Sequence, residues 1–142
     1  MLSETDKAYM AGLVDGEGSI VIEYCNNRRN TKLRMNVTNA HIETLEGLKN
    51  LWGGHLYRRP PNKIKNHKAV GQLGFTAKQA WEVISSIHPY LRIKRKQADL
   101  ALEFAKTLLP PRCNGKRLTE DELSFRANLK DQISKLNKRG YK

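Results

Sequence analysis

The sequence predicts an α+β domain in which one antiparallel four-stranded sheet is covered by helices on a single face. Segments with strand-like alternation occur in two successive pairs, and segments with helical periodicity precede, separate and follow them. Pairs of strands that follow one another in the chain form antiparallel hairpins. The length of 142 residues suits one domain with its own core. The expected order is helix, two strands, helix, two strands, helix, and then further helix.

The first element is expected to be a helix over Glu4–Asp15. Ser3 is a good N-cap, and Asp6 stands three residues later, as in a variant of the capping box. Large apolar residues recur at helical spacing on one side of this segment, and small residues occupy another side. The helix is expected to end at the glycines that follow Asp15.

The strands are recognised by alternation. In residues 31–39, Leu33, Met35 and Val37 alternate with polar residues, so they should face the core together. The other strands are rich in β-branched or aromatic residues or are bounded by turn residues. The four expected strands are residues 19–24, 31–39, 55–59 and 67–75.

Later helices are expected at residues 42–52, 77–87 and 92–109, and Thr119 should cap a last one. The whole chain, 1–142, is predicted to be a single domain. Its parts are an αββαββα core over 1–108, a loop over 109–118, and a C-terminal helix with a basic tail over 119–142.

The charge balance points to a polyanionic partner. The chain has 26 Lys and Arg against 14 Asp and Glu, a net charge of +12. Such a charge suits a nucleic acid or a membrane surface, although it can also serve only solubility. No apolar run approaches the roughly 20 residues of a membrane span. We expect no membrane partner and no small-molecule substrate.

Cysteine and histidine usage and the amino terminus bear on the compartment. Cys25 and Cys113 are far apart and form no Cys-x-x-Cys pair, which is typical of reduced thiols. The histidines have no zinc-ligand spacing. The first residues do not resemble a secretory signal. We therefore expect an intracellular protein, from the cytoplasm of a prokaryote or from an organelle.

The end of the first helix and the turn that follows it gather two carboxylates, Asp15 and Glu17, among glycines. The C-terminal end of a helix carries partial negative charge, so acidic residues are unfavourable there. A surface Asp-Gly turn is one interpretation. The other is a site for a hard divalent cation, because Mg²⁺ accepts carboxylate and carbonyl oxygens.

Small residues line the same helix. Ala8, Gly12 and Gly16 recur every four residues, and Ala11 lies alongside. Such spacing allows two helix backbones to approach closely. The partner is either the chain's own sheet or the same helix of a second copy. In the second case the two Glu17 carboxylates would meet.

Residues Met10–Gly18, "MAGLVDGEG", resemble the LAGLIDADG motif of homing endonucleases. Met10 and Val14 are conservative departures, and Glu17 keeps the carboxylate of the commoner Asp. The resemblance extends over most of the chain, because domains of that family have the element order expected above. It implies a four-stranded antiparallel saddle with helices on one face. The directly matching residues are Ala11, Gly12, Leu13, Asp15 and Gly18.

The resemblance implies a site-specific, Mg²⁺-dependent double-strand DNA endonuclease, with Mn²⁺ able to substitute, that leaves short 3′ overhangs. It makes Glu17 the metal-binding carboxylate, with the Gly16 carbonyl beside it. It places Lys94 near the reacting phosphate and gives Asn39 the task of orienting water. The alternative is a non-cleaving nucleic-acid binder of the same fold, either an intron RNA maturase or a transcription regulator.

One motif is present within these 142 residues. Single-motif members of the family pair, so the resemblance implies a homodimer and a long, near-palindromic DNA target. The expected dimer interface is the first helix, through Ala8, Ala11, Gly12 and Asp15. The uncovered sheet face is polar and basic, so it could be merely solvated or could lie against DNA. The side chains expected to read major-groove base edges are Val21, Glu23, Cys25, Asn27, Lys32, Arg34, Asn36, Arg58, Lys68, Val70 and Gln72.

Overall fold

The structure, a computed structural model, describes residues 2–25, 30–108 and 118–138. Its order of helices and strands confirms the expected α+β class. The elements are α1 (Glu4–Glu17), β1 (Gly18–Tyr24), β2 (Thr31–Asn39), α2 (Ile42–Trp52), β3 (His55–Arg59), β4 (Val70–Thr76), α3 (Ala77–Ile87), the 3₁₀ turn η1 (His88–Tyr90), α4 (Arg95–Ala105), the 3₁₀ turn η2 (Lys106–Leu108) and α5 (Glu120–Leu136).

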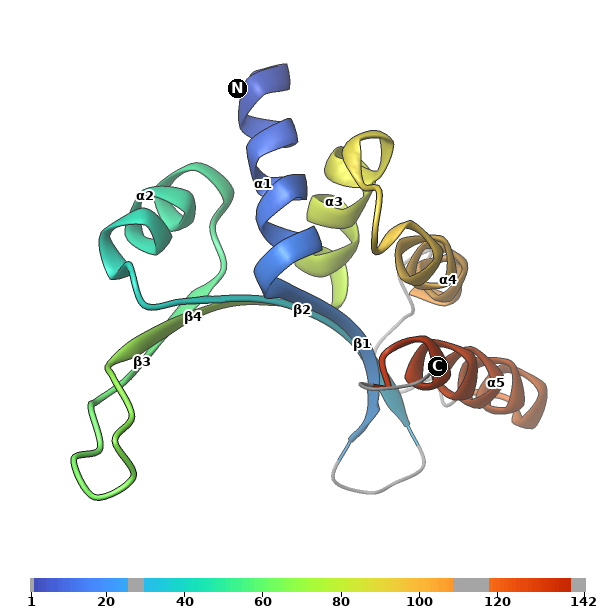
Figure 1. The fold of residues 1–142 in the computed structure, drawn as a ribbon. Helices are drawn as coiled ribbons and strands as arrows, with labels where there is room; N and C mark the ends of the chain where they lie inside the picture. The colour runs from blue at the N-terminus through green and yellow to red at the C-terminus, as the bar shows by residue number, and fades with distance from the viewer. Residues whose placement is uncertain (1, 26–29, 109–117, 139–142) are drawn as a thin grey trace.

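The four strands form one antiparallel sheet in the order β1-β2-β4-β3. The sheet is arched, and α1, α2, α3 and α4 stand on its convex side (Figure 1). The helix α5 lies at the outer edge, beside β1. Among the described residues, the concave side carries no helix (Figure 1). The saddle with helices on one face is therefore confirmed.

The core lies between the convex side of the sheet and the helices. Leu33, Met35 and Val37 of β2 are fully buried, as their alternation predicts. Met10 and Val14 of α1 pack into the same cluster. Since side chains alternate along a strand, the residues between the buried ones face the concave side.

The start of α1 is the expected capping box. The backbone N–H of Asp6 donates to the Ser3 hydroxyl at 3.1 Å, and the backbone N–H of Ser3 donates to the Asp6 carboxylate at 3.0 Å. The hydrogen bond from the Ser3 backbone is the main reason why the pKa of Asp6 is lowered.

The end of α1 lies two residues later than expected, at Glu17, and β1 begins at the next residue. Gly18 makes this abrupt change of direction possible. A Cβ atom at Gly18 would lie 2.7 Å from the Val14 Cα and 2.9 Å from the Asn36 carbonyl oxygen. Only glycine fits so close to two backbones.

The helix expected over residues 92–109 is shorter in the structure. α4 spans Arg95–Ala105, and η2 continues it to Leu108. The backbone at Arg92–Lys94 is not helical because its N–H groups bind the Asp15 carboxylate, as described below. Residue 109 lies outside the described residues.

The C-terminal helix α5 packs against α4 and β1. Its Thr119 cap is confirmed, since the Glu122 N–H donates to the Thr119 hydroxyl at 3.2 Å. Arg126, only 6% exposed, donates to the Thr107 hydroxyl at 2.8 Å and lies over the Phe104 ring. These contacts make α5 part of the same core. The expected loop over 109–118, apart from its last residue, and the end of the basic tail, 139–142, lie outside the described residues, as does Cys113.

None of the helices in the described part of the chain is long and apolar enough to cross a membrane.

Candidate active site and nucleic-acid interface

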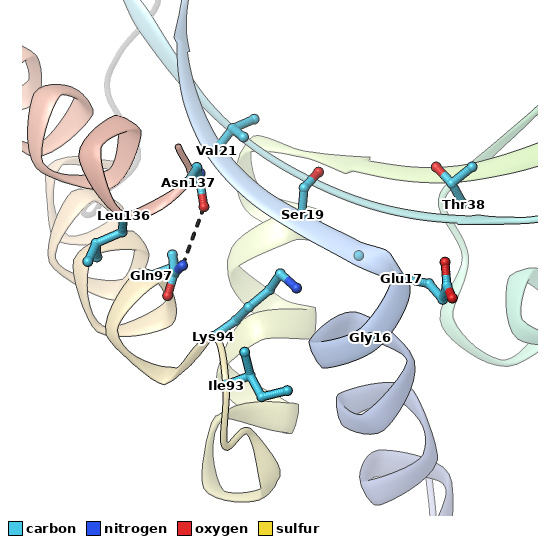
Figure 2. A pocket seen from close by; sticks show the side chains of 11 residues that line it. Gly16, Glu17, Ser19, Val21, Thr38, Ile93, Lys94, Gln97, Leu136 and Asn137 are labelled. Atoms are coloured by element: carbon cyan, nitrogen blue, oxygen red, sulfur yellow. Dashed lines mark hydrogen bonds between the residues drawn. The ribbon is translucent and has the colours of Figure 1, made fainter. Parts of the chain in front are cut away.

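An open pocket of about 690 Å³ lies where α1 ends, β1 begins and α4 approaches them. Figure 2 shows Glu17 on one side of it and Lys94 reaching toward it from the turn before α4. The C-terminal end of α5 forms the opposite wall (Figure 2). The lining residues are Gly16, Glu17, Gly18, Ser19, Val21, Thr38, Ile93, Lys94, Gln97, Leu136 and Asn137.

Asp15 joins α1 to the turn before α4. Its carboxylate accepts from the backbone N–H groups of Arg92, Ile93 and Lys94 at 2.9, 3.1 and 2.9 Å. The Lys94 ammonium donates to the Asp15 carbonyl oxygen at 2.7 Å. Four hydrogen bonds therefore fix the turn that carries Lys94 against the end of α1.

This arrangement removes the electrostatic conflict at the end of α1. The carbonyl groups there carry partial negative charge, and the Lys94 ammonium binds one of them. The Asp15 carboxylate lies instead against the N–H groups that lead into α4, where partial positive charge gathers. Asp15 thus has a structural partner for each of its carboxylate oxygens.

Glu17 differs from Asp15. It is exposed and lines the pocket. Within residues 2–25, 30–108 and 118–138, the structure gives its carboxylate no hydrogen bond and no ion pair. It is thus an anionic group that is placed at the pocket and left free for a ligand.

The pocket offers few protein ligands for a metal ion. No group of three or more His, Cys, Asp or Glu residues able to hold a metal is found among the described residues. Mg²⁺ is commonly bound through one or two carboxylates, with waters and substrate phosphate oxygens as its other ligands. Glu17 and the adjacent Gly16 carbonyl fit that kind of site, and they do not fit a metal cage built from protein alone.

The structure does not bring Asn39 into the pocket. Asn39 follows the alternation of Val37, so it lies on the convex side of β2. Its side-chain oxygen accepts from the His41 N–H at 2.8 Å, just before α2. The neighbouring residue, Thr38, faces the concave side and lines the pocket in its place.

The expected interface residues on α1 divide into two groups. Ala8 and Gly12 are exposed, and so is Gly16. Ala11 is fully buried in the chain's own core, contrary to its expected place on the interface. Asp15 is partly buried, and both of its carboxylate oxygens already accept hydrogen bonds from the turn before α4.

The concave face consists of the alternate residues of all four strands. The register aligns Ser19 with Asn36, and Thr38 with Gln72. It also aligns Gln72 with Tyr57. The concave residues are Ser19, Val21 and Glu23 of β1, Lys32, Arg34, Asn36 and Thr38 of β2, Val70, Gln72, Gly74 and Thr76 of β4, and His55, Tyr57 and Arg59 of β3.

Polar contacts link β1 to β2 across this face. Glu23 lies 3.4 Å from the Lys32 ammonium and 3.5 Å from an Arg34 guanidinium nitrogen. The Arg34 Nε donates to the Asn36 side-chain oxygen at 3.2 Å. The Asn36 amide donates to Ser19 at 3.4 Å. These side chains hold one another in place, with hydrogen-bonding groups still directed to solvent.

Arg58 does not lie on the concave face. It shares the side of Leu56, which packs against the core, and its guanidinium pairs with Glu46 of α2. The adjacent Arg59 and Tyr57 take the concave positions, and Tyr57 is 57% exposed. The apolar residue Leu56 indicates from the sequence alone which residues of β3 share the core side, and Arg58 is one of them.

A second hollow, of about 520 Å³, lies on the concave face. The sequence-based prediction named Lys32, Arg34 and Gln72 among its lining residues but missed His55 and Tyr57. The full lining is Lys32, Arg34, Gly54, His55, Tyr57, Gln72, Gly74, Thr76 and Gln79.

The remaining expected contact residues lie near the ends of the strands. Cys25 directly follows β1 and is partly exposed. Lys68 is exposed in the connection between β3 and β4. Asn27 lies outside the described residues.

The arched sheet, the helix ending in an acidic residue, and the element order define the fold of the LAGLIDADG homing endonucleases. The chain is similar to I-CvuI bound to its target with calcium, with a TM-score of 0.75 and 21% identity over 97% of this chain and 85% of that chain. A second complex of I-CvuI, with 2 mM Mg and uncleaved DNA, gives a TM-score of 0.77 and 19% identity over 98% of this chain and 87% of that one.

Other similar structures support the same fold. The archaeal intron-encoded homing endonuclease I-Vdi141I, complexed with DNA, has a TM-score of 0.71 and 20% identity over 98% of this chain and 88% of that chain. The LAGLIDADG enzyme I-GzeII, with its DNA target, has a TM-score of 0.68 and 18% identity over 97% of this chain but only 47% of that chain. No protein-family model and no curated protein sequence matches the chain.

Proposed function

We propose that the chain is a site-specific homing endonuclease that makes a metal-dependent double-strand break in DNA. The observation that carries the proposal is the placement of Glu17. An exposed carboxylate without a partner among the described residues lines the same pocket as Lys94, and this pocket opens next to the concave face of the sheet. The similar solved structures are homing endonucleases in complex with DNA.

Glu17 and the Gly16 carbonyl would hold Mg²⁺, or Mn²⁺ in its place. When bound, the ion would supply an activated water and neutralise charge on the phosphate and the leaving oxygen. Lys94 would face the same phosphate, and its ammonium would offset the extra negative charge that develops there. The Asp15 hydrogen bonds hold the Lys94 turn in place, so the ammonium needs little reorganisation.

The chain would act as a homodimer paired through α1. Gly12 and Gly16 are exposed, and a Cβ at either would meet nothing within 4 Å. Each glycine lowers helix stability by about 1 kcal/mol relative to alanine, and no contact with the described residues requires a glycine at either position. A second α1 packed closely against them would require both.

Exposed apolar side chains flank the same surface. Tyr9 of α1 is 53% exposed, and Ile93, next to the end of α1, is 73% exposed. The match to 47% of the I-GzeII chain also supports pairing, because this chain corresponds to about half of that one. A two-fold pair would bring both Glu17 side chains to one place and would select a near-palindromic target.

The concave face would bind the DNA. Its arch is free of helices among the described residues, and Lys32, Arg34 and Arg59 provide positive charge. Base edges in the major groove would be read by the polar residues of the four strands. Breaks with short 3′ overhangs would follow if each pocket cuts one strand across the minor groove.

The direct test is cleavage of a randomised DNA library by the purified chain with Mg²⁺, followed by sequencing of the cut ends. We expect one near-palindromic family of sites with short 3′ overhangs and no cutting in EDTA. Specific binding without cutting in Mg²⁺ or Mn²⁺ would favour an intron RNA maturase or a transcription regulator. Absence of any nucleic-acid binding would contradict both functions.

A further inference from the structure

Asn137, the residue directly after α5, closes the pocket on the side opposite α1 (Figure 2). Its side-chain amide donates to the Ile20 carbonyl oxygen of β1 at 2.8 Å. Its side-chain oxygen accepts from the Gln97 amide of α4 at 3.4 Å. The end of α5 is therefore tied to the two elements that border the pocket.

Both partners of Asn137 are buried groups that need a hydrogen bond. Ile20 is fully buried, and β1 is an edge strand with β2 on one side only. A carbonyl directed to the free edge has no partner in the sheet, and leaving it unpaired would be costly. Gln97 is only 9% exposed, so its amide has the same requirement.

The position of these contacts along the chain links them to the candidate active site. Ile20 lies three residues after Glu17, and Gln97 lies three residues after Lys94. Asn137 thus connects the segment that carries the carboxylate to the segment that carries the ammonium. On the α1 side, Asp15 connects the same two segments. Hydrogen bonds therefore join the two segments on both sides of the pocket.

We propose that Asn137 is a positioning residue that fixes the separation between the Glu17 carboxylate and the Lys94 ammonium. The proposal rests on the nuclease function proposed above. It gives α5 a part in the reaction, although this helix supplies neither of the two groups. Loss of a hydrogen bond that orients a metal-binding group typically lowers metal affinity or activity by 10–100-fold.

The test is the Asn137→Ala variant, assayed for DNA affinity and for single-turnover cleavage at saturating protein. We expect DNA affinity within about twofold of wild type and a cleavage rate lower by about 10–100-fold, with a higher Mg²⁺ requirement. Asn137→Gln keeps both the donor and the acceptor and should recover most of the rate. Wild-type cleavage by Asn137→Ala overturns the proposal.

Two control variants separate positioning from stability. Asn128→Ala changes the same residue type at an exposed position of α5 and should behave as wild type. Ile133→Val loosens the packing of α5 at a buried residue and leaves the side-chain hydrogen bonds of Asn137 in place. If Ile133→Val loses as much cleavage as Asn137→Ala at a similar melting temperature, Asn137 has only a structural role and the proposal is wrong.

Hydrogen exchange of the free protein gives a readout that needs neither metal nor cleavage. In Asn137→Ala, amides of residues 18–22 and 94–98 should exchange at least about 10-fold faster, and in Asn128→Ala they should not change. If amide exchange is unchanged in both segments, the Asn137 hydrogen bonds do not hold these segments and the proposal is wrong. A wild-type chain that cuts no DNA while these segments still respond would instead overturn the proposed nuclease function.

Discussion

Lys94 binds Asp15 through two separate hydrogen bonds: its backbone N–H donates to the carboxylate at 2.9 Å, and its ammonium donates to the carbonyl oxygen at 2.7 Å. The negative end of α1 and the positive end of α4 meet at this pair. The two acidic residues of the turn therefore have different tasks. Asp15 holds the structure together, and Glu17 remains available to a ligand.

Replacement of Asp15 by Asn should lower the free energy of unfolding by about 1–3 kcal/mol, because an amide NH₂ would face backbone N–H donors. Urea unfolding followed by circular dichroism measures this change. Asp131→Asn is the control, since Asp131 is exposed on α5 and has no partner among the described residues. Equal stability of the two variants would contradict the anchoring role of Asp15.

Replacement of Glu17 by Gln should abolish cleavage and leave DNA binding within a few fold of wild type. The amide keeps the size of the side chain but loses the charge that would hold Mg²⁺. In a dimer it would also remove the repulsion between two carboxylates, so the melting temperature should equal or exceed that of wild type. Gel shift, cleavage and thermal melting measure the three properties.

The control for Glu17 is Glu43→Gln, which makes the same change at an exposed position of α2. It should cut at the wild-type rate. If Glu17→Gln also cuts normally, Glu17 is not the metal ligand.

Replacement of Gly12 by Leu should convert the proposed dimer to a folded monomer. A Cβ at Gly12 meets nothing within 4 Å among the described residues, and Gly12 is exposed, so the fold should accept the leucine, which would push a second α1 away. Gly47→Leu is a matched control, because Gly47 is also exposed within a helix and has open space around it. Sedimentation of Gly12→Leu as an unchanged dimer would refute the pairing through α1.

Arg58 and Arg59 form a matched pair on opposite faces of β3. Arg59→Ala should weaken DNA binding and reduce the slope of log K against log salt by about one unit for each copy in the dimer. Arg58→Ala should leave both unchanged, because Arg58 pairs with Glu46 on the convex side. Salt titrations of binding by fluorescence anisotropy compare the two. If Arg58→Ala weakens binding and Arg59→Ala does not, DNA binds on the convex side and the proposed concave interface is wrong.

The capping box of α1 should contribute to the acid sensitivity of the fold. Hydrogen bonds from Ser3 lower the pKa of Asp6 in the folded chain relative to the unfolded chain. This stabilisation is therefore fully present above the pKa of Asp6 in the unfolded chain, about 4. It is lost as the pH falls through the lower pKa of Asp6 in the folded chain. Asp6→Asn should be less stable than wild type near neutral pH, and the difference should shrink in acid. Unfolding measured from pH 6 to pH 2 tests this.

Local patterns predicted most of the fold. β2, α2, β3 and α3 have the predicted bounds. Alternation defines β2, Gly53 and Gly54 separate α2 from β3, Pro60 follows β3, and Pro89 lies shortly after α3. The start of α4 could not be predicted in this way. It depends on Asp15, which lies 79 residues from Lys94 in the chain and removes the turn before α4 from the helix.

The errors in the candidate site came mostly from assigning strand residues to the wrong face of the sheet. Asn39 continues the buried series of Val37, and Arg58 continues the side of Leu56, so both face away from the concave side. Strict alternation from the apolar neighbours would have placed them correctly. Asn137 and Gln97 had no comparable signal, because their contacts join three elements that are distant in sequence.

α1 passes into β1 without any linker, since the helix ends at Glu17 and the strand begins at Gly18. A helix turns by about 100° per residue, and a strand turns each residue to the opposite face. One inserted residue at this junction would therefore either swing Glu17 out of the pocket or turn Val21 and Glu23 into the core. The junction therefore sets the position of the proposed metal ligand and the facing of β1 at the same time. If the chain is the proposed nuclease, substitutions in β1 could change its DNA preference, whereas an insertion at the junction would abolish cleavage.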